Sequence, residues 1–559
     1  MSKNHRLWLT VMLVMATLCG SMTTAWAKDA PPPVEPEFAR PRPAHVPSDD
    51  QLVALGAIIG KIELNRRTVF DTTNSETDGW VFRTANKLHK TTRASVIASQ
   101  LLFKTGQTYD PRLVSESERI LRSNEFLFDA AIVPMAYRDG VVDLLVTTRD
   151  LWSIEPELSW SRSGGENESV FGIEDENFLG TGALIGARFE SDLDRDAKLL
   201  YFSDRQIGRR WLSLDVLYSD NSDGSAAYFS LRRPFFALDT RRAGGLTLLD
   251  NDRIDSLYRL GDEVVDYAHD ETFVDAWVGW SPGLIDGWVR RWRLGVVDHE
   301  HRFFAPPEGM LAGAVPADRK LIYPYLSVEL VQDQFIKASN VEQISRTEDF
   351  YLGTRLFASV GYAGTSLGSD RSAWMLSGGA QRGFGSAKKR MLLLNADTSG
   401  RIESGRTANA LVSASARYYH RLSPKWLRFM TMRAVKGVNL DLDQPLQIGG
   451  DNGLRGYPAR YQSGDGRMLF SIEQRYFTDW YPWRILRVGG AVFVDVGRSF
   501  GDNPVGGQSL GWLRSVGFGL RLAPTRGAGK VFHIDVSFPL DGDPSVDSVQ
   551  ISLDRKVGF

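Results

Sequence analysis

Alternation of apolar and polar residues dominates the chain from about residue 160 onward. It recurs in residues 212–218, 516–522, 532–538 and 549–553. Because successive side chains of a strand point to opposite faces, each segment predicts a β-strand with one apolar face. Segments of about ten residues with this pattern are typical of a barrel that has lipid outside and water inside. Soluble β-sandwiches use shorter strands, of about 5–6 residues. We therefore expect a transmembrane antiparallel β-barrel over residues 156–559.

A different pattern precedes the barrel. Residues 56–155 mix strand and helix periodicities, and Asp110-Pro111 supplies an N-cap and a first-turn proline for a helix. Asp139-Gly140 predicts a tight turn between two strands. We expect one small α/β domain with strands over 57–64, 130–137 and 141–148 and helices over 94–103 and 111–124.

The first 55 residues predict export and a linker. Lys3 and Arg6 precede an apolar run over 7–18, and a small-x-small site ends at Ala27, as in a secretory signal peptide over residues 1–27. Residues 28–55 are rich in proline and predict an extended periplasmic tether. The one cysteine, Cys19, lies inside the predicted signal, so the exported chain would carry no thiol.

Charge and hydropathy exclude some classes of protein. The formal net charge is −2, which gives no basic footprint for nucleic acid. Beyond the signal no run of about 18 apolar residues is present, so the sequence predicts no membrane-spanning helix. Only a closed barrel would then pair every backbone group inside a bilayer.

One loop motif resembles a known family. Leu454-Arg455-Gly456-Tyr457 resembles the tip of the loop that folds back into barrels of the BamA/TamA outer-membrane insertase and transporter superfamily, also called the bacterial surface antigen family. Five predicted strands follow it, as in the last five of that family's sixteen strands. The resemblance implies that Arg455 meets Asp495, in a Phe-x-Asp sequence that begins at Phe493, and a second carboxylate at Glu473. A buried guanidinium needs such partners, which its planar fork can meet bidentately.

Two further segments resemble the same family. Residues 176–182 are similar to the turn after the first barrel strand, and residues 56–155 are similar to a polypeptide-transport-associated (POTRA) domain. The resemblance implies a sixteen-stranded barrel in the cell outer membrane with a single POTRA domain in the periplasm. Segments near 240–270 and 300–345 are then assigned to long outer loops.

The implied function is insertion or transport of polypeptides, without an enzymatic step or a cofactor. Nascent outer-membrane or secreted polypeptides, outer-membrane lipids and a periplasmic accessory protein are the expected partners. Incoming chains would add as a strand to the POTRA edge and pass to a weak seam between the first barrel strand, 169–178, and the last, 549–559. The single POTRA domain favours a dedicated or accessory role over that of a general assembly machine.

Two other functions stay open. The barrel could be a passive pore that the loop narrows, or a barrel enzyme, although nothing in the sequence groups His420 with a serine. Residues 298–301 (Asp-His-Glu-His) have the types of metal ligands. Alternate residues of a strand face opposite ways, so we expect no metal site there.

The aromatic residue Phe559 predicts how the barrel is recognised for assembly. A terminal aromatic on the last strand is expected to act as the C-terminal assembly signal. Deleting Phe559 should lower the amount of membrane-inserted protein far more than total synthesis, measured by membrane fractionation against whole-cell protein. Equal insertion of the truncated and intact chains would contradict this role.

Overall fold

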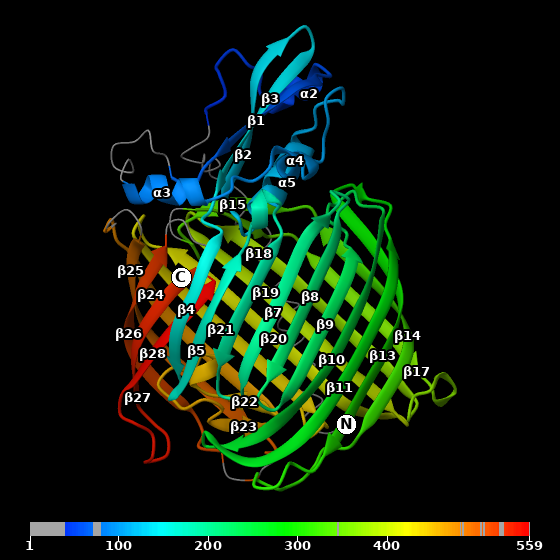
Figure 1. The fold of residues 1–559 in the computed structure, drawn as a ribbon, viewed down its shortest axis with the longest axis vertical. Coiled ribbons are helices and arrows are strands. Elements are labelled where there is room, and N and C mark those ends of the chain that lie inside the picture. The colour runs from blue at the N-terminus through cyan, green and yellow to red at the C-terminus, as the bar shows by residue number, and fades with distance from the viewer. Residues whose placement is uncertain are drawn as a thin grey trace.

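The computed structural model describes residues 40–70, 80–343, 346–480, 482, 486–503, 506, 509–524 and 530–557. A small α/β domain lies over one end of a large closed β-barrel (Figure 1). We call that end of the barrel the near end and the opposite one the far end. Among the described helices, none is long and apolar enough to cross a bilayer.

The small domain is a three-stranded sheet with helices packed on it. The strand order is β1-β3-β2, with β1 parallel and β2 antiparallel to β3. The expected order of strand, helix, helix, strand, strand is confirmed, with two additional helices: α2 before the first strand and α3 before the predicted pair. The elements are α2 (Asp49–Ala54), β1 (Ile58–Arg67), α3 (Trp80–Leu88), α4 (Ala94–Ser99), α5 (Pro111–Arg122), β2 (Leu127–Arg138) and β3 (Val141–Asp150).

Local sequence explains these elements. Asp110 caps α5 by accepting from the Arg112 amide at 2.9 Å, and Asp139 and Gly140 take positive φ angles of 49° and 80° in the β2–β3 turn. Leu52 of α2 is fully buried in the core of this domain. The core therefore extends into the range that the proline content predicts as tether. The signal peptide and the first part of that tether lie outside the described residues.

In the described chain the barrel contains twenty strands, besides the two-residue β12, where sixteen were expected. Consecutive strands pair antiparallel around the whole wall. The strands are β4 (Ile154–Ser163), β5 (Glu166–Asp175), β6 (Leu184–Ser191), β7 (Asp196–Ile207), β8 (Leu212–Asn221), β9 (Gly224–Arg233), β10 (Arg242–Arg259), β11 (Asp262–Trp280), β12 (Leu284–Ile285), β13 (Trp288–Phe304), β14 (Arg319–Gln332), β17 (Arg355–Ala363), β18 (Ala373–Ser386), β19 (Arg390–Glu403), β20 (Arg406–Arg421), β21 (Trp426–Val438), β24 (Gly466–Phe477), β25 (Leu486–Phe500), β26 (Leu513–Pro524), β27 (Lys530–Pro539) and β28 (Gln550–Val557).

The expected count was wrong because charged segments were read as outer loops. β10 and β11 have 18 and 19 residues, more than the about 9–11 that a tilted strand needs to cross a bilayer. Their far halves also carry charged residues on the outward face, such as Asp252 and its cross-strand partner Asp270, and these charges weaken the alternation that identifies strands. β13 and β14 likewise cover much of 300–345. The five strands expected after the loop motif, β24 to β28, are confirmed.

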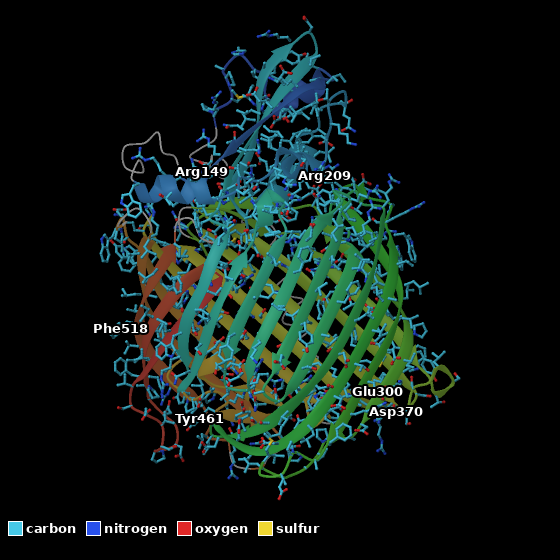
Figure 2. The ribbon with its side chains drawn as sticks, viewed as in Figure 1. Arg149, Arg209, Glu300, Asp370, Tyr461 and Phe518 are labelled. Atoms are coloured by element: carbon cyan, nitrogen blue, oxygen red, sulfur yellow. The ribbon has the colours of Figure 1, made fainter. Side chains whose placement is uncertain are left out.

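Apolar side chains cover the outside of the barrel. Phe518 on the outer wall is 52% exposed (Figure 2), and Phe171, Leu200, Val278 and Ile551 are each more than half exposed. Inward positions of the same strands carry buried polar groups. This division suits a wall with lipid on one side and a polar interior on the other, so we treat the barrel as membrane-spanning.

Two connections enter the barrel instead of forming simple turns. The mouth hairpin (residues 333–354) leaves the near end and contains β15 (Phe335–Ser339) and β16 (Thr347–Tyr351). The inserted loop (residues 439–465) leaves the far end and contains β22 (Leu446–Ile448), β23 (Gln462–Gly464) and the short turn η3 (Gly450–Asn452). Two other 3₁₀ turns, η1 (Phe178–Gly180) and η2 (Thr365–Leu367), belong to ordinary connections.

Candidate functional site

Arg455 fixes the inserted loop to the barrel wall. Its Nε and one terminal nitrogen donate to the two oxygens of Asp495 at 2.7 and 2.8 Å. Its other terminal nitrogen donates to Glu473 Oε1 at 2.7 Å. The guanidinium carbon lies 3.4 Å from the centre of the Phe493 ring. The structure thus brings together all four of these residues, which the sequence singles out.

Burial makes this contact strong and obligatory. Arg455 is 8% exposed, Glu473 7%, and Asp495 fully buried. A bidentate arginine–carboxylate pair is among the stronger hydrogen-bonded contacts in proteins, and a cation over an aromatic face adds to it. Because each charge has lost its water, removal of one partner leaves another buried and uncompensated.

The rest of the motif shapes the loop tip around that contact. Gly456 has φ of 96°, and a Cβ there would lie 3.2 Å from the Cβ of Ser515, so a larger residue would be strained and crowded. Leu454 and Tyr457 are fully buried, and the Tyr457 hydroxyl donates to the Arg514 carbonyl oxygen at 2.7 Å. All four motif residues therefore hold the tip against the wall.

Sequence reasoning missed several members of the network. The Ser471 hydroxyl accepts a hydrogen bond from Arg455 at 3.2 Å. Asp535 lies 3.5 Å from the Arg455 guanidinium and accepts a hydrogen bond from Arg521 at 2.6 Å. Arg475 donates to the second oxygen of Glu473 at 2.9 Å. Each is an inward residue of β24, β26 or β27. For Ser471 and Arg475 the available signal was their two-residue spacing from Glu473 on the same strand; Asp535 and Arg521 lie on other strands and only register brings them close.

The inserted loop also touches both strands at the barrel seam. Its Ala459 amide donates to the Gly164 carbonyl oxygen, in the β4–β5 turn, at 2.8 Å. A Cβ on Gly164 would lie 2.2 Å from the Ala459 nitrogen, so this approach requires glycine. Its Tyr461 hydroxyl accepts from the Asp543 amide, in the β27–β28 turn, at 2.7 Å. The loop therefore bridges the far end of the seam from inside.

The seam itself has little backbone pairing. In the described residues, β28 and β4 share one registered pair, Leu553 with Arg162, whereas β27–β28 share eight and β4–β5 ten. Toward the near end, Arg555 donates to Glu155 at 2.6 Å and lies 3.7 Å from Glu157.

The expected position of the first strand was therefore wrong. Residues 169–178 overlap β5, and the seam strand is β4. The β4 sequence contains Pro156. Because proline has no backbone N–H to donate, it is found in edge strands and its presence argues against a central strand. A strand beside a weakly paired seam is such an edge.

The mouth hairpin joins the small domain to the lumen. Arg122 of α5 donates both its Nε and a terminal nitrogen to Asp349 of the hairpin, each at 2.7 Å. Thr347 donates to Asp129 at 2.7 Å. Burial acts to lower the pKa of Arg122, but the hydrogen bonds and charge of Asp349 hold that pKa above its ordinary value. The hairpin is thus fastened to the domain above it.

The hairpin's apolar side is buried among lumen-facing residues of the wall. Val341, Phe350 and Leu352 pack in one cluster with wall residues that include Met391 and Tyr419. Arg475, which holds Glu473, also reaches the Val341 carbonyl oxygen at 3.5 Å. The inserted loop and the mouth hairpin are therefore connected by a chain of contacts that runs along β24 through Glu473 and Arg475.

The 176–182 turn docks on the small domain. Asn177 donates to the Thr92 hydroxyl at 2.8 Å, and the Arg93 amide donates to the Gly180 carbonyl oxygen at 2.9 Å. The family resemblance of this turn thus coincides with a contact between the domain and the wall. Phe559, the expected assembly signal, lies outside the described residues.

Arg455→Ala tests the network. The substitution leaves Asp495 and Glu473 buried without the guanidinium, and we expect it to weaken loop anchoring by about 3–5 kcal/mol. Limited proteolysis should cut within residues 439–465, and heat-modifiable gel mobility should shift to lower temperature. Arg406→Ala is the control, because Arg406 is exposed at the far end of β20. Loop protection equal to that of the unaltered chain would refute the anchoring role.

Comparison with known proteins gives structural similarity without sequence similarity. No protein-family model matches the chain, and no curated protein matches it. Similar solved structures include BamA from Haemophilus ducreyi lacking POTRA domains 1–3, at 13% identity over 89% of this chain and 83% of that one, with a TM-score of 0.37. CdiB from Acinetobacter baumannii has 14% identity over 89% and 74%, with a TM-score of 0.45. CdiB from Escherichia coli has 12% identity over 89% and 76%, with a TM-score of 0.48.

Proposed function

We propose that this protein is an outer-membrane barrel that moves polypeptides into or across the membrane at the seam between β4 and β28. The observation that carries the proposal is that β4 and β28, over the residues that the structure describes, share a single registered backbone pair. Unpaired strand edges accept strands of other chains. Separating β4 from β28 costs far less backbone hydrogen bonding than separating any of the adjoining pairs.

Occupancy of the lumen favours the seam over a central pore as the route. The inserted loop is held by Arg455 from the far end, and the mouth hairpin is held by Arg122 and the lumen cluster from the near end. A cavity of about 460 Å³ remains beside Arg455, lined in part by Glu342 of the hairpin and Asp451 of the loop. A passive pore would have to conduct past both segments.

The small domain is the proposed receiving surface in the periplasm. β2 is an edge strand of its sheet, and residues 136–138 at the end of that strand are partly or fully exposed. An extended polypeptide could pair with this edge through main-chain hydrogen bonds. The domain sits directly over the barrel and contacts the turn after β5, so a captured chain would be close to the seam.

The proposed partners follow from these surfaces. Nascent outer-membrane or secreted polypeptides are the substrates, lipids contact the apolar outer wall, and a periplasmic accessory protein could deliver the substrate. No covalent step is involved, so we propose a transporter or insertase that works without a cofactor, in a dedicated or accessory role.

A disulfide across the seam tests this function. Leu553 and Arg162 are directly opposed, a separation that suits a disulfide. We expect the double variant Arg162→Cys, Leu553→Cys to form the disulfide readily. The locked protein should no longer give crosslinks between substrate and the seam strands, and cells should lose the protein's activity. Adding a reductant should restore both.

Val536→Cys with Ile551→Cys is the matched control, since it joins β28 to its other neighbour at a registered pair. This bond should leave activity unchanged in both redox states. If the locked seam leaves activity intact, the seam route fails and a central pore becomes the better account.

A further inference from the structure

The lumen contains a second polar cluster that the proposed function does not use. It lies on the opposite part of the wall from the Arg455 network, toward the far ends of β10, β11 and β13. His269, Glu271 and His301 each present a ligand atom there, and these atoms lie within 4.8 Å of one another. Figure 2 labels Glu300, the residue before His301, toward the far end of the barrel. We propose that these three residues form a binding site for a divalent transition-metal ion of the Zn²⁺ class.

Strand register assembles the set. Glu271 of β11 is directly opposite His301 of β13, and His269 lies two residues before Glu271 on the same face. His269 and His301 are buried and Glu271 is half-buried. Alternation places Asp298 and Glu300 on the other face, as the sequence indicates. The two residues that complete the set come from the neighbouring strand, about thirty positions earlier in the chain.

Hydrogen bonds prepare His269 as a ligand. Asp255 Oδ2 lies 2.7 Å from His269 Nδ1 and accepts a hydrogen bond from it. The neutral ring therefore presents a lone pair at Nε2, which faces His301 Nδ1 at 2.9 Å. Metal-binding histidines commonly donate their second ring nitrogen to a carboxylate in this way. A metal ion between the two nitrogens would replace the shared proton, with the rings moving to about 3.3 Å apart, the edge of a tetrahedral site.

Glu271 is oriented from both sides. His299 donates to its Oε1 at 2.9 Å, and Arg253 donates to its Oε2 at 3.0 Å. Each carboxylate oxygen has a second lone pair, so the group can still bind a cation. Arg253 also donates to Asp255 at 3.0 Å, and its one positive charge is outweighed by the two carboxylates. The cluster keeps a net negative charge, which favours a dication.

The donor set indicates the class of ion. Two imidazole nitrogens and one carboxylate suit Zn²⁺ and its transition-metal neighbours, whereas Mg²⁺ and Ca²⁺ prefer oxygen ligands alone. Three protein ligands leave one position for water. The ion would cross-link β11 to β13 close to Arg319, which lies over Phe303 and holds Asp443 of the inserted loop at 2.6 and 2.8 Å.

Binding of Zn²⁺ alone to the full chain, purified and refolded or extracted in detergent, tests the site. We expect one equivalent to bind saturably and to raise the temperature of heat-modifiable gel mobility, because a ligand of the folded state stabilises it. His269→Gln and His301→Gln should each weaken binding by more than about 100-fold, and Asp255→Asn by roughly 10- to 100-fold. Co²⁺ should give a visible absorption band that the first two variants lose.

His420→Ala is the matched control, since His420 lies on β20 outside the cluster, and its Zn²⁺ affinity should equal that of the unaltered chain. Heat-modifiable mobility without metal shows which variants are folded. Absence of saturable binding to the folded chain would overturn the proposal. A folded His269→Gln variant that binds Zn²⁺ as tightly as the unaltered chain would also overturn it. If the ligand variants fail to fold, the same result in folded Asp255→Asn would overturn it.

Discussion

The architecture depends on one buried charge. Arg455 is held by Asp495 and Glu473 in a part of the lumen where none of the three has appreciable contact with solvent. Such a cluster is tolerated only when every charge is paired, so it fixes the inserted loop in a single position. From there Arg475 continues the contacts to the mouth hairpin, and the hairpin continues them to the small domain through Asp349. A guanidinium held at the middle of the wall, on a loop that enters from the far end, is thereby coupled to a domain outside the near end.

The same loop bridges the weakly paired part of the wall. It binds the β4–β5 turn through Gly164 and the β27–β28 turn through Tyr461, so it fastens the far end of the seam from inside. Arg555 and Glu155 fasten the near end with an ion pair. Between them, in the described part of the chain, the backbone contributes one registered pair. A seam closed by side chains and a loop can open without breaking a continuous ladder, and this is the property that a lateral route needs.

Sequence alone gives much of this and fails where contacts are long-range. Period-two alternation predicts the five strands after the loop, because that signal is local. The site was predicted by the resemblance of the motif at 454–457 to a known loop, which implies Glu473 and Asp495 as partners of Arg455. The count of sixteen failed at β10 and β11, whose far halves carry outward charges that interrupt the alternation. The first strand was misplaced because Pro156 masks β4. His269 was missed as a partner of His301 because the register of β11 against β13 brings them together. No single segment of the sequence encodes that register.

Site-specific photo-crosslinking in cells tests the central claim most directly. A photoreactive phenylalanine analogue at position 551 would face outward from the seam strand β28, and the same analogue at position 492 would face outward from β25; Ile551 and Val492 are both 56% exposed. The account predicts adducts with polypeptides in transit from position 551 and few from position 492, with the former lost when the seam is locked by a disulfide. Equal polypeptide adducts from both positions, or adducts at 551 that persist with the seam locked, would contradict passage between β4 and β28.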